Sequence, residues 1–195
     1  MSEHSAAHAH QFEDAEQQLD ATTFGMWVFL LTEILLFGGL FAGYTVYRWS
    51  YPQAFAGASR YLDLTLGAVN TVVLISSSLT MALAVRAAQL GARRSLVGCL
   101  LATLLLGGVF LVIKGFEYHH KYVEHHIPGA LFVFEGPLAN QAQIFFSFYF
   151  ALTGAHAVHM IVGAGLLVYF IFQAARGRYT AQYFGPVEIM GLYWH

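Results

Sequence analysis

The stretch FGMWVFLLTEILLFGGLFAGYTVY, which runs from Phe24 to Tyr47, decides the fold class. Its 24 residues carry a single charged side chain, Glu33. A helix of about 20 predominantly apolar residues crosses the hydrocarbon core of a bilayer, so this stretch predicts a transmembrane helix. Arg48 and Trp49 follow directly, and a basic residue beside a tryptophan is typical of the membrane interface.

The composition of the whole chain also indicates a membrane protein. Of its 195 residues, 57% are apolar, 16% are aromatic and only 10% are charged, whereas soluble domains have about 25% charged residues. The net charge is −2 and the nine Lys and Arg residues are scattered, so no basic face indicates a nucleic-acid partner. The single cysteine, Cys99, lies in a hydrophobic run and leaves no intrachain disulfide or cysteine-based metal site.

Further apolar runs predict three more complete spans, at residues 64–85, 96–116 and 144–172. Pro186 in a first helical turn predicts that a fifth span begins at about residue 187, and we expect this span to be truncated where the sequence stops. Residues 1–22 form a polar N-terminal tail, and residues 52–59, with their Gly and Pro, are predicted to be a loop. The predicted fold is an all-α integral membrane protein, a transmembrane helix bundle over residues 23–195 with four complete spans and the start of a fifth.

Basic residues in short loops set the orientation of such a bundle. The loops after the second and fourth spans carry five arginines: Arg86, Arg93, Arg94, Arg176 and Arg178. The opposite side carries four basic residues: Arg48, Arg60, Lys114 and Lys121. Because the N-terminus shares the side of the five arginines, we expect it to lie in the cytoplasm.

Glu33 is the most informative single residue. It lies nine residues into the first span, about 13 Å along the helix axis at about 1.5 Å per residue. A carboxylate at that depth costs several kcal/mol unless it is protonated or paired, so it is expected to face the protein interior. Two interpretations stay open: a proton-active or lipid-contacting carboxylate, and a protonated glutamic acid that bonds a neighbouring helix.

His156 and His159 lie three residues apart in the fourth span and therefore share one helix face. The first and fourth spans should run antiparallel, and Glu33 and His159 then differ in depth by only about 6 Å at about 1.5 Å per residue. We therefore hypothesise a hydrogen bond from Glu33 to His159 or to His156, which would satisfy both polar groups at once. Metal ligation by the two histidines is a less favoured alternative, because no other histidine clearly lies in the apolar core.

A cluster of acidic and histidine side chains follows the third span: Glu117, His119, His120, Glu124, His125 and His126. Its density suggests a metal site. Adjacent histidines point in different directions on a helix, however, so the spacing fixes no ligand geometry. A polar interfacial segment that solvates a helix end is the favoured interpretation.

Several motifs occur together in a fixed order. They are FLLTEILLFGGLFAGY in the first span, VNTVVLISSS in the second, GFEYHHKY at the end of the third, FYFALTGAHAVHMIVG in the fourth, and the terminal FGPVEIMGLYWH. This ordered set, from about residue 24 to residue 195, resembles subunit III of the haem-copper oxidases, which are cytochrome c oxidases and quinol oxidases. Each motif alone is weak evidence for this resemblance, but the ordered set is specific. The chain resembles the five-span bacterial form, because it lacks the first two of the seven spans in mitochondrial-type members.

The resemblance implies an accessory subunit of a proton-pumping terminal oxidase in the bacterial inner membrane. Subunit III of that family has no redox centre, binds phospholipid, and supports proton uptake and durability during turnover. Haem and copper would belong to partner subunits, subunits I and II would be the partners of this chain, and other respiratory complexes would be further partners. The residues that match the family's lipid-binding or proton-linked positions are Glu33, His156, His159, Glu117 and Glu188.

Three alternatives remain at the level of the sequence. The first, from the same family, is a subunit III-like partner of nitric oxide reductase. The second is a small proton-coupled membrane transporter in which Glu33 and the two membrane histidines form a proton relay. The third is a membrane enzyme with metal bound to the histidine-rich segment. The sequence does not name the electron donor, because donor sites lie on other subunits.

Overall fold

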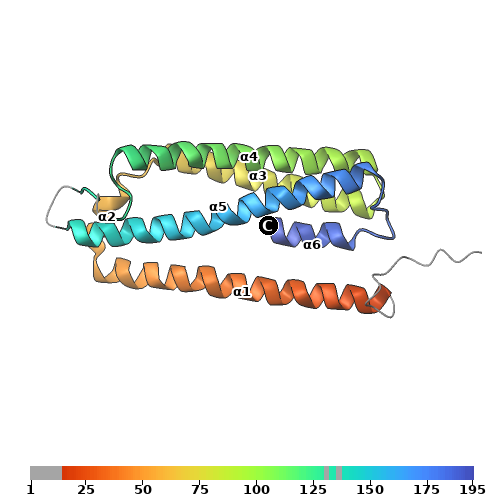
Figure 1. Cartoon of the computed structure of the whole chain (residues 1–195), viewed down its shortest axis with the longest axis horizontal. Helices are drawn as coiled ribbons and strands as arrows, with labels where there is room; N and C mark the ends of the chain where they lie inside the picture. The colour runs from red at the N-terminus through yellow and green to blue at the C-terminus, as the bar shows by residue number, and fades with distance from the viewer. Residues whose placement is uncertain (1–14, 130–131, 135–137) are drawn as a thin grey trace, which may run out of the picture.

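The chain is a bundle of long, nearly parallel or antiparallel helices (Figure 1). A computed structural model describes residues 15–129, 132–134 and 138–195, so most of the predicted N-terminal tail lies outside the described residues. The described helices are α1 (Ala15–Ser50), α2 (Pro52–Ser59), α3 (Leu64–Gln89), α4 (Arg93–Val123), α5 (Ala139–Ala175) and α6 (Gly185–Trp194). Four of them, α1, α3, α4 and α5, are long and apolar enough to cross a membrane, as predicted.

The helices extend beyond the apolar runs that predicted them. Helix α1 already includes residues 15–22, which the sequence assigned to the tail, and α4 continues to Val123. Polar residues can continue a helix past the hydrocarbon core, so hydropathy marks the buried length of a span rather than its ends. Helix α6 begins at Gly185, two residues before the predicted start of the fifth span.

The predicted loop over residues 52–59 is wrong, because this segment forms helix α2. Pro52 stands in the first turn, where its missing N–H has no intrahelical partner to lose. Ala54, Phe55 and Ala58 are buried and pack α2 against the start of α5. Burial of this short apolar face explains why Gly and Pro did not produce a loop here.

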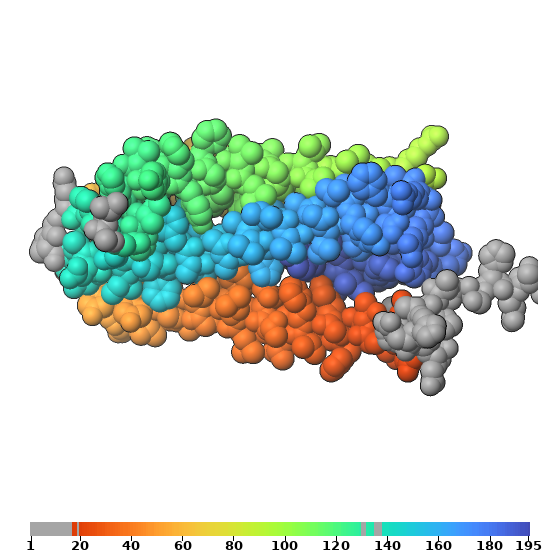
Figure 2. All heavy atoms as spheres, in the orientation of Figure 1, coloured from red at the N-terminus to blue at the C-terminus, as the bar shows by residue number. Residues whose placement is uncertain are grey.

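Helix α1 lies along one side of the bundle. It contacts α2, α5 and α6, and within the described residues it makes no contact with α3 or α4. Figure 2 shows it as a separate orange-to-red ridge beside the cyan-to-blue surface of α5. Large apolar side chains along α1, such as Leu31, Ile34 and Leu35, are exposed in the isolated chain, as expected of a helix that meets lipid or another membrane protein.

Two apolar clusters hold the bundle together at its two ends. One joins α3, α4, α5 and α6 through buried residues that include Met81, Leu100, Leu167 and Val187. The other joins α2 to α5 through Phe55, Phe145 and Phe146, with Tyr44 of α1 packed against it.

Helix α6 is seated on glycines of two neighbouring helices. A methyl group at Gly107 of α4 would lie 2.8 Å from the Trp194 ring, and one at Gly163 of α5 would lie 2.9 Å from the Tyr193 ring. Trp194 Nε1 also donates a 2.8 Å hydrogen bond to Ser77 Oγ. The small residues therefore let two large aromatic side chains approach the helix backbones closely.

We predict that Gly163→Ala destabilises the chain by about 1–3 kcal/mol, since the new methyl group overpacks the contact with Tyr193. The matched control is Gly165→Ala on the same helix, where a methyl group meets no atom within 4 Å. Thermal unfolding of the two variants in detergent would measure the difference. Equal unfolding temperatures for both variants would contradict the close packing of α6 against α5.

Candidate functional site at a glutamate–histidine pair

The candidate site lies where α1, α5 and α6 meet. Helix α1 supplies Glu33, α5 supplies His156 and His159, and the end of α6 supplies Tyr193. These side chains border a cavity of about 220 Å³. The rest of its wall is mostly apolar and aromatic: Phe29, Leu30, Phe37, Met160, Leu192, Trp194 and His195.

The predicted contact between Glu33 and His159 is present. His159 Nε2 lies 2.9 Å from Glu33 Oε2. The two atoms are at ion-pair distance, but the N–H direction is not aligned with the carboxylate, and Glu33 Oε2 has no aligned hydrogen-bond donor. The contact is therefore a close electrostatic pairing rather than a well-formed hydrogen bond.

Aromatic rings surround the His159 imidazole. The ring centroids of Phe29, Phe37 and Tyr193 lie 6.3, 5.8 and 5.9 Å from that of His159. The Tyr193 hydroxyl donates a 3.0 Å hydrogen bond to the backbone carbonyl of His159. Because these rings limit the access of bulk solvent, the electrostatic interaction between the imidazole and the carboxylate is stronger than it would be in water.

The other nitrogen of His159 faces its own helix. Nδ1 lies 3.3 Å from the carbonyl oxygen of Ala155, one turn earlier in α5, and a carbonyl oxygen only accepts, so Nδ1 is the donor in this contact. Nε2, the nitrogen beside Glu33, is an acceptor in a neutral imidazole and a donor in a protonated one. A neutral acid beside a neutral imidazole and a carboxylate beside an imidazolium carry the same total charge, and the geometry is compatible with both arrangements.

His156 lies beside this pair but does not join it. Its ring is edge-on to Phe110 of α4, with centroids 5.3 Å apart. Its buried Nε2 has no hydrogen-bond partner within the described part of the chain. Of the two partners predicted for Glu33, the structure therefore selects His159 and leaves His156 as a polar neighbour on the wall of the same cavity.

Glu117 belongs to a separate site between α4 and α5. Its side chain is buried and accepts two aligned hydrogen bonds, a 2.5 Å bond from the Tyr149 hydroxyl and a 2.8 Å bond from Lys114 Nζ. Lys114 Nζ also lies 5.4 Å from the centroid of the Tyr149 ring. With both oxygens satisfied, Glu117 links the two helices, and no contact that the structure describes joins it to Glu33.

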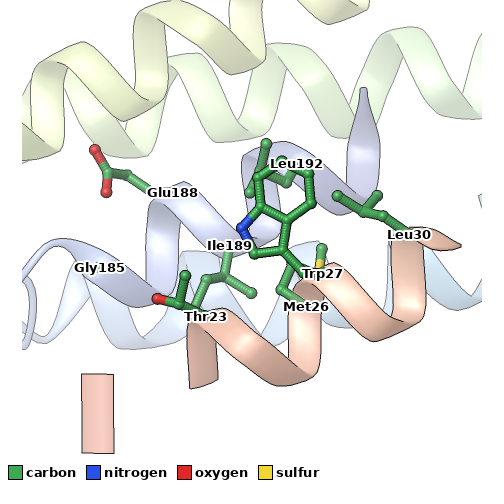
Figure 3. A pocket seen from close by; sticks show the side chains of 8 residues that line it. All are labelled: Thr23, Met26, Trp27, Leu30, Gly185, Glu188, Ile189 and Leu192. Atoms are coloured by element: carbon green, nitrogen blue, oxygen red, sulfur yellow. The ribbon is translucent and has the colours of Figure 1, made fainter. Parts of the chain in front are cut away.

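Glu188 also lies away from the pair, at the start of α6. Its Oε1 accepts a 2.8 Å hydrogen bond from Gln89 Nε2, which ties α6 to the end of α3. Figure 3 shows its carboxylate directed away from Trp27 and Thr23, at the edge of a second cavity of about 140 Å³ between α1 and α6. This cavity is lined mainly by apolar side chains of Met26, Trp27, Leu30, Ile189 and Leu192.

The histidine-rich segment after the third span is organised around Glu124. Lys121 Nζ lies 2.6 Å from Glu124 Oε2, His126 Nδ1 lies 3.1 Å from the same oxygen, and His120 Nε2 lies 3.0 Å from Oε1. His119 and His125 are exposed to solvent. No group of three potential ligand residues in the described ranges is arranged to hold a metal ion. The segment is thus an ion-pair network at a helix end.

This network also fixes the surrounding loops. Buried Lys121 donates a 2.6 Å hydrogen bond to the carbonyl oxygen of Tyr61, which ties α4 to the segment between α2 and α3. The His126 ring stacks on Phe146 of α5, with centroids 5.1 Å apart. Burial acts to raise the pKa of Glu124, but hydrogen bonds from Lys121 and His126 outweigh it and hold that pKa below its ordinary value of 4.5.

Three polar contacts within the bundle were not predicted from the sequence. They are the Tyr149–Glu117 bond, the Trp194–Ser77 bond, and the 2.5 Å contact between Ser78 Oγ and His195 Nδ1. The polar run at Ser76–Ser78 in an otherwise apolar span was a signal for bonds between helices. It did not identify the partners, Trp194 at the end of α6 and His195 directly after it, which lie more than a hundred residues later in the chain.

The Glu33–His159 contact predicts an energetic coupling. In a double-mutant cycle with Glu33→Ala and His159→Ala, we expect the effects on unfolding free energy to be non-additive by about 0.5–3 kcal/mol, because either single change leaves one polar group without its partner. Chemical denaturation in detergent would measure the four free energies. Glu33→Ala combined with Glu124→Ala is the control, and these two changes should be additive. Additivity in the Glu33–His159 cycle would contradict the pairing.

The network at Glu124 predicts a pH dependence. Because the pKa of Glu124 is lower in the folded chain than in the unfolded chain, the network contributes fully above the ordinary value of 4.5 and loses its contribution as pH falls through the lower folded pKa. We expect the loop after α4 to become more sensitive to an acid-active protease below pH 4.5. In Glu124→Gln this pH dependence should disappear, because the amide does not titrate and the network is already weakened above pH 4.5. A pH profile identical to that of the unsubstituted chain would count against the network.

The fold and the site define a membrane-embedded helical subunit with a carboxylate–imidazole pair inside its bundle. Comparison with known proteins agrees with this class. The family described as "Cytochrome c oxidase subunit III" matches residues 7–195. The chain therefore belongs to the cytochrome c oxidase subunit III family.

Individual relatives show the same similarity. The chain is 31% identical over 195 aligned residues to "Cytochrome bo(3) ubiquinol oxidase subunit 3" of Pseudomonas aeruginosa, covering 98% of this chain and 85% of the relative. It is 31% identical over 173 residues to "Cytochrome c oxidase subunit 3" of Corynebacterium diphtheriae, covering 88% and 78% of the two chains. It is also 28% identical to "Heme-copper oxidase subunit I+III" of Aeropyrum pernix over 87% of this chain and 20% of that protein.

Proposed function

We propose that this chain is the accessory subunit III of a proton-pumping haem-copper terminal oxidase. It would bind phospholipid, support proton uptake by the catalytic subunit and stabilise it during turnover, and it would carry no redox centre of its own. The oxidase would contain haem and copper in subunits I and II and use cytochrome c or a quinol as donor. The location would be the inner membrane of a bacterium, with the N-terminus in the cytoplasm.

The family match supports the assignment to an oxidase complex. The relatives include subunits named for cytochrome c oxidases and for a ubiquinol oxidase, so both donor classes stay within the proposal. The Aeropyrum pernix relative is named as subunits I and III in one chain. A fusion of this kind supports direct packing of this chain against a subunit I, because two fused domains are held at high effective concentration.

The observation that carries the proposed proton role is the Glu33–His159 pair. It is a carboxyl group and an imidazole in contact, beside a cavity and a histidine whose Nε2 is without a partner in the described structure. A proton that passes from one member of such a pair to the other leaves their total charge unchanged, so this step creates no net charge inside the membrane. Glu117 and Glu188 are proposed to hold helices in place around this site, because each is bonded to a neighbouring helix or side chain.

The lipid role is supported by the lining of the two cavities beside α1. Both lie between α1 and α6, and their walls are mostly apolar and aromatic, which suits an acyl chain. In the described residues α1 contacts α5 and α6 but neither α3 nor α4, so the two cavities lie at the side of the bundle, where a lipid chain can reach them. Glu33 would then face a lipid-filled seam on one side and His159 on the other.

The first test is co-purification. In mild detergent, we expect this chain to elute in one peak with haem absorbance and copper. Gentle removal of the chain should leave the haem spectrum of the remaining complex nearly intact while its turnover decays faster. Loss of haem on removal, or elution of the chain without haem and copper under every mild condition, would contradict the accessory role.

A second test separates a proton role from a structural one. In the double variant Glu33→Leu with His159→Leu, two apolar side chains replace the pair, and such replacement of a buried pair is often neutral or stabilising. We expect this variant to assemble and keep its haem spectrum but to lose activity faster during turnover than a Gly165→Ala control. If the double variant were as durable as the unsubstituted complex, the pair would be structural only.

A further inference from the structure

The cavity beside Glu33 combines one carboxyl group with aromatic walls. It has a volume of about 220 Å³, and four aromatic residues among those that line it are Phe29, Phe37, Tyr193 and Trp194. The smaller cavity of about 140 Å³ continues it toward the start of α6, because Leu30 and Leu192 line both cavities. Figure 3 shows these two leucines among the residues around the smaller cavity. The space next to Glu33 therefore has room for an apolar body as well as a polar group.

Glu33 has unused capacity to accept hydrogen bonds. A carboxylate offers about four acceptor sites on its two oxygens. Its described partner is His159 Nε2, 2.9 Å from Glu33 Oε2, and no donor in the described residues is aligned with that oxygen. The Glu33 side chain keeps 23% of its surface exposed, so a ligand in the cavity can reach it. A group with several N–H donors would satisfy this carboxyl group better than one imidazole nitrogen does.

The walls of the cavity suit a cation. The rings of Phe29, Phe37 and Tyr193 surround the His159 imidazole, at the level of the carboxyl group. An aromatic ring attracts a cation over its face, and this attraction is stronger where water is excluded. Within the described part of the chain neither Lys nor Arg lines either cavity, so no basic side chain of the protein takes this place.

We propose that this cavity binds a protonated lipophilic amine, a ligand with an ammonium group and a hydrocarbon body. The ammonium group donates to Glu33, and the hydrocarbon body packs against the aromatic rings and the two leucines. The ammonium group takes the place of the proton that Glu33 and His159 share, and that proton leaves to solvent. Because one positive charge replaces another, binding adds no net charge to the membrane interior.

Depth distinguishes this ligand from a phospholipid. Glu33 lies near the middle of the span Asp20–Ser50, whereas the charged groups of a phospholipid lie at the membrane surface. An acyl chain that reached Glu33 would bring only methylene and methyl groups, which form no hydrogen bond with a carboxylate. The proposal does not rest on the oxidase assignment, and occupation by an acyl chain alone is an outcome that the test must separate.

The test uses the full chain in nanodiscs of a zwitterionic lipid, with 1-adamantylamine and 1-adamantanol as probes. The two probes have the same hydrocarbon body, but the amine is a cation at neutral pH and the alcohol is not. Equilibrium dialysis of radiolabelled probes would measure their binding above the uptake by empty nanodiscs. We expect the chain to bind the amine with an affinity higher by about tenfold or more, because hydrogen bonds to charged groups are the stronger ones.

Two variants separate the carboxylate from the rings. Glu33→Gln keeps the shape of the side chain, and it should lower the affinity for the amine to that for the alcohol while the affinity for the alcohol stays unchanged. Phe37→Leu keeps an apolar wall without a ring, and it should weaken amine binding by about threefold or more, again without an effect on the alcohol. Circular dichroism of each variant would verify that the helices are retained.

The matched control is Glu124→Gln, which removes the same charge from the ion-pair network after α4, outside both cavities. Both affinities should be unchanged in this variant. Equal affinities of the unsubstituted chain for amine and alcohol would overturn the proposal and leave an apolar cavity for an acyl chain only. Amine binding that survives Glu33→Gln, or that falls equally in Glu124→Gln, would also overturn it. None of these measurements involves haem or turnover, so their outcome is separate from that of the oxidase assignment.

Discussion

The structure depends on one constraint: a polar group inside the hydrocarbon layer is costly unless it finds a partner within the protein. Several such groups are bonded within the bundle, whereas the Asn70 side chain and His156 Nε2 have no partner in the described part of the chain. Glu33 meets His159, Glu117 meets Tyr149 and Lys114, and Trp194 meets Ser77. These contacts fix which faces of the helices meet, a choice that apolar packing alone leaves nearly free in lipid.

Glu117 and Glu33 meet this constraint in different ways. Glu117 accepts aligned hydrogen bonds at both oxygens and is buried, which makes it a fixed link between α4 and α5. Glu33 has a single close neighbour with imperfect alignment, and a cavity lies beside it. A carboxyl group that keeps spare bonding capacity is the one suited to exchange a proton. The difference in geometry thus supports a functional role for Glu33 and a structural role for Glu117.

The sequence predicted much of this arrangement. Apolar runs located the four long helices, and the matched depths of Glu33 and His159 in antiparallel spans predicted their contact. Hydropathy did not predict α2, because a short helix with buried Ala54, Phe55 and Ala58 is stabilised by α5 rather than by its own pattern. The sequence did not predict the ion pairs around Glu124 either. Their geometry depends on where the chain turns after α4 and on Phe146 of α5, on which the His126 ring stacks. Contacts made by α6 could not be assigned for the same reason: spacing along one helix does not specify a partner on another.

The close packing of α6 on Gly163 and Gly107 restricts how the helices can move relative to one another. Tyr193 donates to the backbone of α5 and Trp194 to a side chain of α3, while both rings rest where Gly163 and Gly107 leave room. A slide of α6 along its axis would break both hydrogen bonds and drive a ring into a helix backbone. Changes in bilayer thickness should therefore tilt α3, α4, α5 and α6 as one rigid block instead of shearing them. The aromatic ring that covers His159 would keep its position as the surrounding membrane thins or thickens.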